Sequence, residues 1–191
     1  MKLVCLLGSP RREGNSATIA AHLVAKAAEL GAETETIYLN GLNYRGCQGC
    51  YVCKTSLDHC VLNDELTPVL ESVRQADVLL LASAVYYGDV SAQLKGFIDR
   101  SFSYLVPDYF ATSQPSRLES GKKLAFVLTQ GQPDEAMFAD IFPRYNFFFK
   151  WYGYQEGRLI RGCGLSERST VTKRTQLFQQ AEETARTLVL G

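Results

Sequence analysis

The chain has 191 residues, of which 46% are hydrophobic and 21% charged, and its 20 basic and 20 acidic side chains give a formal net charge of zero. This composition is ordinary for a globular protein, and the length predicts one domain spanning residues 1–191 that buries a core without disulfide bonds. A neutral chain argues against nucleic-acid binding, which usually requires a basic excess, and the lack of an 18-residue apolar run argues against a membrane span.

The first elements are a strand, a helix and a second strand. The apolar run Lys2–Leu7 predicts a strand that ends at the turn residues after it. A helix follows, with Asn15 or Ser16 as its expected N-cap and Gly31 as its end. The next run, Glu33–Leu39, predicts the second strand.

The middle of the chain begins with an irregular stretch and then returns to regular elements. Residues 40–63 show no periodic pattern, and Asp64 is the expected cap of a helix over residues 65–76. The run Asp77–Ala82 is almost entirely apolar, which predicts a third strand covered on both faces. Ser91 is the expected N-cap of the helix after it.

Two further strands complete the pattern. After a loop at Pro107–Gly121, the sequence predicts a strand at Lys123–Thr129, a helix at Pro133–Lys150, a strand at Tyr154–Arg161 and a last helix that carries Phe178. Strands that alternate with helices predict an α/β fold, with a doubly wound five-stranded parallel sheet in a three-layer α/β/α arrangement. Ligands bind such sheets beyond the carboxyl ends of the strands, so the loops there are the candidate sites.

The loop after the first strand has the composition of an anion site. Backbone N–H groups at the start of a helix attract anions, and short polar side chains and arginines add donors. The Gly-x-Gly-x-x-Gly pattern is absent, which favours a mononucleotide phosphate over a tightly held NAD. The alternative is a polar turn that only caps the helix. The loop reads Gly8-Ser9-Pro10-Arg11-Arg12-Glu13-Gly14-Asn15-Ser16.

Two later loops offer surfaces for a flat ring. Adjacent tyrosines, Tyr86 and Tyr87, follow the third strand and present apolar faces with polar tips; the alternative is that they pack in a subunit interface. Small polar residues follow the fourth strand, where they can bond a ring edge or form an ordinary turn. The two loops read Ser83-Ala84-Val85-Tyr86-Tyr87-Gly88-Asp89-Val90-Ser91 and Thr129-Gln130-Gly131-Gln132.

Together these loops resemble those of the NADPH-dependent FMN reductase branch of the flavodoxin-like superfamily, over nearly the whole chain. The resemblance implies a flavodoxin-like fold and an FMN cofactor. Ala84 stands where the family usually has proline, so we expect a less rigid ring loop. The matching pair Asp99-Arg100 is interpreted as a structural ion pair, buried or at an interface. The implied cofactor-binding residues are Ser9, Arg11, Asn15 and Ser16 for the phosphate, and Ser83, Ala84, Val85, Tyr86, Tyr87, Gly88, Thr129, Gln130, Gly131 and Gln132 around the ring.

Four of the six cysteines, Cys47, Cys50, Cys53 and Cys60, form the pattern C-x2-C-x2-C-x6-C. No signal-peptide pattern is present, which predicts a cytoplasmic protein whose cysteines are metal-bound, catalytic or reduced. The first three match the spacing of [4Fe–4S] ligands in bacterial ferredoxins, but four thiolates also suit zinc, and free or redox-active thiols are the third interpretation. Cys5, inside the first strand, is expected to pack as a small buried hydrophobe.

Within the resembling family, iron–sulfur flavoproteins carry a compact cysteine motif of this kind. The resemblance therefore implies an FMN-dependent oxidoreductase with one of two alternative electron donors. The donor would be ferredoxin if a [4Fe–4S] cluster is present, and transiently bound NAD(P)H if it is not. In both cases FMN would pass electrons to a small-molecule acceptor, such as a quinone or free flavin, with no essential side-chain acid or base. A homodimer or homotetramer is expected. The alternatives are a non-enzymatic flavodoxin-like electron carrier and a thiol-based or zinc-based redox sensor.

Overall fold

The computed structural model describes residues 1–155, 157–167 and 170–191. Its sheet has five parallel strands in the order β2-β1-β3-β5-β6, which confirms the predicted α/β fold. The strands are β1 (Lys2–Leu7), β2 (Glu33–Tyr38), β3 (Val78–Tyr86), β5 (Lys123–Thr129) and β6 (Arg158–Gly162). A two-residue strand, β4 (Asp89–Val90), pairs antiparallel with the end of β3 and was not predicted.

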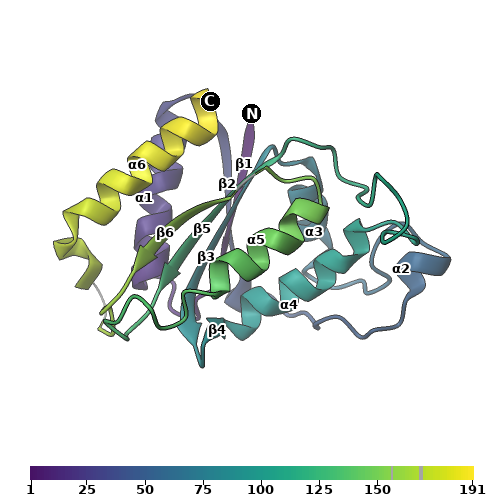
Figure 1. Ribbon diagram of the computed structural model, residues 1–191, viewed down its shortest axis with the longest axis horizontal. Helices are drawn as coiled ribbons and strands as arrows, with labels where there is room; N and C mark the ends of the chain where they lie inside the picture. Colours follow the sequence, from purple (N-terminus) through teal and green to yellow (C-terminus); the bar gives the residue numbers. More distant parts are fainter. Residues whose placement is uncertain (156, 168–169) are drawn as a thin grey trace.

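Helices cover both faces of the sheet, as the three-layer prediction requires. Helices α1 and α6 pack on one face, and α3, α4 and α5 pack on the other (Figure 1). The helices are α1 (Asn15–Glu29), α2 (Val52–Thr55), α3 (Thr67–Gln75), α4 (Ala92–Arg100), α5 (Ile141–Trp151) and α6 (Thr175–Leu190). None of them, within the described ranges, combines the length and the apolarity that crossing a bilayer requires.

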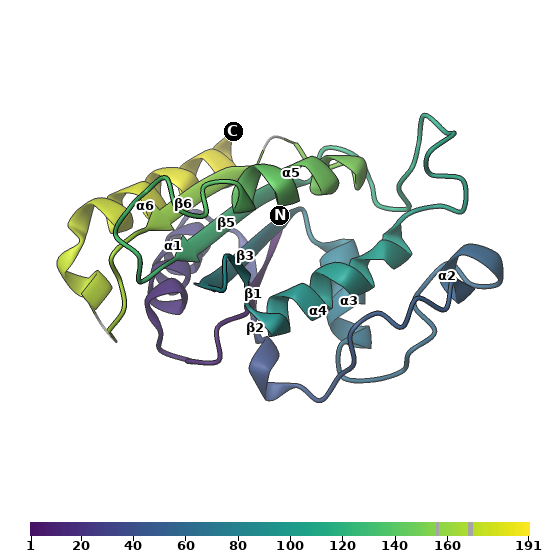
Figure 2. The same ribbon diagram turned by 60° about the horizontal axis from the view of Figure 1, so that its bottom comes forward.

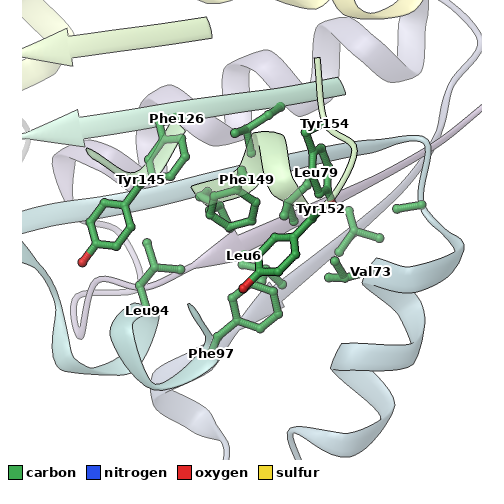
Figure 3. Packing of buried hydrophobic residues seen from close by; sticks show 14 of the residues in the cluster. Leu6, Val73, Leu79, Leu94, Phe97, Phe126, Tyr145, Phe149, Tyr152 and Tyr154 are labelled. Atoms are coloured by element: carbon green, nitrogen blue, oxygen red, sulfur yellow. The ribbon is translucent and has the colours of Figure 1, made fainter. Parts of the chain in front are cut away.

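Each face of the sheet has its own apolar core, because successive side chains of a strand point to opposite faces. Leu3 and Cys5 of β1 are fully buried on the α1 and α6 side, which confirms the expectation for Cys5. On the other side, aromatic rings of α5 lie over β5, and the ring of Phe149 meets the ring of Phe126 edge-on at 6.0 Å (Figure 3). Burial of a side chain of this size stabilises the fold by about 1.5–3 kcal/mol.

The starts of the helices differ most from the predictions. Helix α1 begins at Asn15 with Gly14 as its N-cap, so neither Asn15 nor Ser16 caps it. Helix α3 begins at Thr67, and Asp64 instead accepts a hydrogen bond from the Leu66 N–H in the turn before it. The prediction for α4 is confirmed, because the Ser91 hydroxyl accepts a hydrogen bond from the Leu94 N–H at 3.3 Å.

The last third of the chain shows two shifts. Helix α5 begins at Ile141, eight residues after the predicted start, because the residues before it form a loop held by the Gln130 side chain. Strand β6 covers Arg158–Gly162 and not Tyr154–Arg161; Tyr154 makes only an isolated bridge with Lys122. The predicted strand at Lys123–Thr129 is confirmed residue for residue.

Candidate functional site

The loops that follow β1, β5 and β6 and the last residues of β3 and β5 meet at one edge of the sheet and line a hollow of about 220 Å³. This edge is the carboxyl end of parallel strands, and the hollow lies where the strand order reverses around β1 and β3. The lining consists of Ser9, Arg11, Gly14, Asn15, Ser16, Ala84, Val85, Tyr86, Thr129, Gly131, Leu165 and Ser166. The fold thus brings together residues from all three loops that the sequence singled out.

The loop between β1 and α1 is shaped as an anion cradle. Ser9 and Ser16 are buried at the hollow, and the Ser9 hydroxyl accepts a hydrogen bond from the Arg11 N–H at 3.1 Å. Gly14 is the N-cap of α1 and offers no side-chain cap, so the N–H groups of the first helical turn stay open to a ligand. A Cβ at Gly14 would lie 3.1 Å from the Arg11 Cβ and 3.3 Å from the Ser9 hydroxyl, and would therefore narrow the cradle.

The side chain of Asn15 is already used by the fold. Its amide donates to the carbonyls of Leu165 and Glu167 at 3.2 and 2.8 Å, and its oxygen accepts from the Val171 N–H at 3.3 Å. Asn15 therefore ties the loop after β6 to the start of α1, and this brings Leu165 and Ser166 into the hollow. Neither residue was predicted from the sequence, although their position shortly after a parallel strand was the available signal.

Ser83 lies beneath the ring loop and does not line the hollow. Its hydroxyl donates to the carbonyl of Ala84 at 2.8 Å and accepts from the Ser91 N–H at 2.9 Å. The Ser91 hydroxyl in turn donates to the carbonyl of Gly8 at 2.6 Å. These bonds join the end of β3 to the loop after β1, so Ser83 fixes the relative position of the two loops.

Strands β3 and β4 form a hairpin that carries the two tyrosines. Tyr86 pairs with Asp89, and the two residues between them, Tyr87 and Gly88, have φ angles of 49° and 77°. Positive φ at both central residues is required by a type I′ turn, in which Asn-Gly is the usual pair. Tyr86 lines the hollow, whereas the side chain of Tyr87 is fully exposed at the tip and, with Gly88, lies outside the lining.

The loop after β5 contributes its backbone and small residues. Thr129 and Gly131 line the hollow. Gln130 is buried; its amide donates to the carbonyls of Gln132 and Asp134 at 3.0 and 3.1 Å. Its oxygen accepts from Arg161 at 2.7 Å. Gln130 and Gln132 therefore shape the loop from outside the lining.

This arrangement fits a ligand that has an anionic group and a flat ring. The open first turn of α1, with its buried hydroxyls, suits a phosphate. Tyr86 and Val85 on one side, and Thr129 and Gly131 on the other, provide walls for a ring that lies against the strand ends. These four residues include no catalytic acid–base pair, which agrees with a site that positions a cofactor.

The four cysteines of the C-x2-C-x2-C-x6-C pattern lie in the long segment between β2 and α3 and line a second hollow together with Arg100. Cys47 and Cys50 are exposed, Cys53 and Cys60 are half-buried, and all four are free thiols. Among the residues that the structure describes, no three His, Cys, Asp or Glu side chains come together as ligands of a single ion. The donor set of four thiols around one hollow suits a soft metal centre such as an iron–sulfur cluster.

Cations surround this cysteine segment. The ammonium of Lys54 lies 3.6 Å from the Cys53 sulfur and donates to the carbonyls of Phe102 and Leu105, both at 2.7 Å. Burial lowers the pKa of Lys54, and the nearby Cys53 partly opposes this shift. Arg117 donates to the carbonyl of Cys53 at 3.1 Å. A negatively charged group held by the thiols would therefore lie in a positive environment.

The two hollows share no lining residue. Helix α2, which contains Cys53, projects at one end of the molecule, away from the β3–β4 hairpin at the strand ends (Figure 2).

Asp99 and Arg100, which were expected to form a structural ion pair, each pair with a different residue. Asp99 bonds Lys95 at 2.5 Å, and the buried Arg100 bonds Asp64 at 2.8 Å. A structural ion pair is present, but the two neighbours do not pair with each other.

Comparisons with known proteins agree with this geometry. Residues 1–142 match the family model described as NADPH-dependent FMN reductase. The chain is 41% identical over 101 residues to an iron-sulfur flavoprotein of Methanocaldococcus jannaschii, and 36% identical over 101 residues to one of Methanosarcina thermophila. Each match covers 53% of this chain and 52% of the relative, so the chain spans about half the length of the curated relatives it matches.

Two solved structures show the same fold. An FMN-dependent NADH-azoreductase from Bacillus anthracis, in complex with FMN, gives a TM-score of 0.76 at 14% identity and covers 99% of this chain and 100% of its own. An NAD(P)H:quinone oxidoreductase from Methanothermobacter marburgensis also gives 0.76, at 20% identity, and covers 98% of this chain and 96% of its own. At these identities the likeness establishes the flavodoxin-like fold.

Proposed function

The chain belongs to the NADPH-dependent FMN reductase family, and we propose that it binds FMN in the hollow at the strand ends and uses it to pass electrons to a small-molecule acceptor. Membership of the family makes it an oxidoreductase. A quinone or a free flavin is the acceptor class we propose. We also propose that the chain works as a homodimer or homotetramer, without nucleic acid and away from membranes.

The observation that carries this proposal is the convergence of separate segments at the carboxyl ends of the strands on one hollow, at a helix start that has no side-chain cap. Ser9, Ser16 and the N–H groups of the first turn of α1 would hold the phosphate, and Arg11 would add a charge-assisted hydrogen bond. Asn15 would act through its backbone N–H, because its side chain is bonded to the loop after β6.

When bound, a flavin supplies a centre that accepts two electrons as a hydride and releases them singly. The chain's own residues position the ring: Val85 and Tyr86 form one wall, and Thr129 and Gly131 form the other. Tyr87 and Gly88 lie at the hairpin tip, where they can fold over the ring or meet a second subunit.

For the electron donor, we propose that Cys47, Cys50, Cys53 and Cys60 hold a [4Fe–4S] cluster that accepts electrons from a ferredoxin. The four thiols line one hollow among cations, and the curated relatives are named iron-sulfur flavoproteins. A cluster would supply one-electron transfer between the donor and the flavin site. The second candidate, favoured by the family model, is direct reduction by NAD(P)H with the cysteines as free thiols or a zinc site.

The test is to purify the whole protein without oxygen, record its visible spectrum, and measure iron and acid-labile sulfide in the same sample. Flavin bands with about four irons per chain support the cluster. Flavin bands without iron support the NAD(P)H-dependent form, and zinc in place of iron supports a structural metal. A protein that binds no flavin after addition of FMN contradicts the central proposal.

A second measurement separates an enzyme from an electron carrier. Oxidation of NADPH with a quinone acceptor, catalysed at substoichiometric protein, is expected of a reductase and is not expected of a flavodoxin-like carrier.

A cysteine variant tests whether the two hollows bind their groups independently. Cys50→Ser should lower iron content and leave FMN bound, because the two hollows share no residue. Cys163→Ser, at a cysteine outside the four, is the matched control and should change neither.

A further inference from the structure

Arg100, the last residue of α4, is buried beneath the cysteine segment, which is the stretch 45–62 that contains the four cysteines. Its side chain is 0% exposed, and the residue lines the same hollow as Cys47, Cys50, Cys53 and Cys60. A buried guanidinium keeps its positive charge, since the group does not deprotonate in proteins. Arg100 is therefore a fixed positive charge beside four thiols.

The guanidinium holds both ends of the cysteine segment. One terminal nitrogen, Nη1, donates to the carbonyl of Arg45 at 3.0 Å and to the carboxylate of Asp64 at 2.8 Å. The other, Nη2, donates to the carbonyl of Leu62 at 3.2 Å. Arg45 precedes the first cysteine and Leu62 follows the last, so one side chain fixes where the segment leaves and rejoins the body of the molecule.

The third nitrogen, Nε, is different. It is buried and has no hydrogen-bond partner among the described residues. Buried polar groups are nearly always hydrogen bonded, and a buried charged group without a partner is especially unfavourable. An acceptor is therefore missing at this position, and the hollow that Arg100 lines contains four sulfur atoms and no carboxylate.

We propose that Arg100 donates its Nε–H to a sulfur of the group that the four cysteines hold, and so raises the reduction potential of that group. This inference rests on the proposed iron–sulfur cluster. A cluster bound by four thiolates carries net negative charge, and its potential depends on hydrogen bonds to sulfur and on nearby charges. Arg100 supplies both, since its charge is buried and Asp64 is its one ion-pair partner among the described residues. It is a positioning and tuning residue and is not itself a ligand.

Lys54 and Arg117 are also positive charges near the cysteines, and they would raise the reduction potential of the bound group from other positions. Lys54 approaches the Cys53 sulfur at 3.6 Å, while Arg117 donates to the carbonyl of Cys53 and to those of Ser103 and Leu105. Lys54 is partly open to solvent, where its charge is screened. The buried, unscreened Arg100 is therefore expected to influence the potential more than Lys54 does.

The experiment compares the wild type with Arg100→Met, Arg100→Lys and Asp64→Asn, each purified anaerobically as the full chain. Iron and sulfide content are measured first, and the midpoint potential is then determined by redox titration followed by electron paramagnetic resonance. Arg100→Met should make reduction at least tenfold less favourable, which is about 59 mV more negative for a one-electron couple. Arg100→Lys keeps the charge without the Nε–H and should shift the potential in the same direction by less.

Asp64→Asn separates electrostatics from a loosened loop. It removes a negative charge near the hollow and leaves Arg100 in place, so the potential should become more positive. A purely structural role for Arg100 predicts shifts of the same direction in Arg100→Met and Asp64→Asn, and that result would overturn the proposal. An unchanged potential in Arg100→Met would do the same.

Two further outcomes remain decisive. If Arg100→Met binds too little iron to titrate, Arg100→Lys decides, and an unchanged potential there overturns the inference. If the wild type takes up no iron even after anaerobic reconstitution with iron and sulfide, the proposed cluster fails and this inference fails with it. If the wild type binds iron but the Arg100 variants leave the potential unchanged, the result contradicts only the role of Arg100 and not the proposed cluster.

Discussion

At the scale of single residues, several polar side chains near the strand ends are bonded to the protein before any ligand arrives. Asn15 directs its side chain to the backbone of the loop after β6, whereas Ser83 and Gln130 direct theirs to backbone atoms of their own hairpin and loop. A buried polar side chain needs such partners, because leaving it unpaired costs about 1–3 kcal/mol. These residues therefore hold the loops that form the site, whereas backbone N–H groups and small hydroxyls remain for the ligand.

Cys5 illustrates how burial controls reactivity at this scale. Burial raises the pKa of the Cys5 thiol to about 12, despite a hydrogen bond with Thr36. The thiolate is the reactive form, so at pH 8 nearly all of Cys5 stays in the unreactive thiol form. Iodoacetamide at pH 8 should therefore modify the exposed Cys47 and Cys50 in iron-free protein and leave Cys5 unmodified, as read by mass spectrometry of peptides. Equal labelling of Cys5 in the folded protein would contradict this burial.

The pair between Asp64 and Arg100 should contribute measurably to stability. Burial alone would raise the pKa of Asp64, but hydrogen bonds from Arg100 and from the Arg45 and Leu66 N–H groups lower it below its usual value. Asp64→Asn leaves a fully buried guanidinium without its counter-charge, and should lower the free energy of unfolding by about 3 kcal/mol at pH 7. Urea denaturation of the iron-free protein measures this difference.

The pH dependence of that difference follows from the direction of the shift. Because the folded pKa of Asp64 is depressed, the stabilisation is fully present above the unfolded value of about 3.9. It is lost as the pH falls through the lower folded value. The gap between wild type and Asp64→Asn should therefore be constant from pH 7 to about pH 5 and shrink below about pH 4. A gap that grows in acid would show that another group carries the effect.

At the scale of elements, the β3–β4 hairpin is the clearest local conflict between sequence and conformation. Its tip places Tyr87 at a φ of 49°, in the left-handed region that a bulky residue rarely adopts. The side chain is fully exposed, so packing within the chain does not explain the choice of tyrosine. Such conformations concentrate at functional sites, which supports the proposal that this hairpin takes part in the flavin site.

Tyr87→Asn should therefore stabilise the chain and weaken the site. Asn-Gly is the preferred pair in a type I′ turn, so the free energy of unfolding should rise by about 1 kcal/mol. Retention of FMN after gel filtration should fall, because the exposed aromatic face is lost. Tyr87→Phe is the matched control, since it keeps the ring and the backbone strain, and should change neither value. An unchanged flavin content in Tyr87→Asn would remove Tyr87 from the proposed site.

The same hairpin shows where prediction from sequence ended. The strands at Lys2–Leu7 and Lys123–Thr129 were predicted with correct bounds, because apolar runs flanked by turn residues define buried strands well. The hairpin was missed because the pair Tyr87-Gly88 lacks the asparagine that usually marks the turn. The start of α5 was missed because Phe138 has a φ of 65° and interrupts an otherwise helical pattern.

The sequence predicted which segments form the candidate site, but it did not predict the hydrogen bonds of the individual side chains. Ligands bind at the carboxyl ends of parallel strands, and this rule placed Ser9 after β1, Tyr86 at the end of β3 and Thr129 at the end of β5 around one hollow. Sequence did not reveal which side chains are bonded to distant backbone. The bonds from Asn15 to the loop after β6 join residues about 150 positions apart, and only the folded chain brings Leu165 into the hollow.

At the scale of the whole molecule, the two hollows depend on different parts of the fold. The hollow at the strand ends is set by the order of β1, β3 and β5, which forms the buried centre of the sheet. The cysteine segment lies outside the sheet and is held by side chains such as Arg100 and Arg117. The stability that the chain gains by binding FMN in the first hollow should therefore not depend on the cysteines, and it should depend on the phosphate cradle at Gly14.

Binding of FMN should stabilise the entire chain by mass action. At one hundred times its dissociation constant, FMN should add about 2.7 kcal/mol to the free energy of unfolding, and so raise the Tm by about 5–10 °C for a domain of this size. Gly14→Val should abolish this rise, because its Cβ meets Arg11 and the Ser9 hydroxyl within 3.1–3.3 Å and fills the phosphate cradle. Gly46→Val, whose Cβ meets nothing within 4 Å, is the matched control and should keep the full rise. Differential scanning fluorimetry with and without FMN gives both values, and a full rise in Gly14→Val would place the phosphate elsewhere.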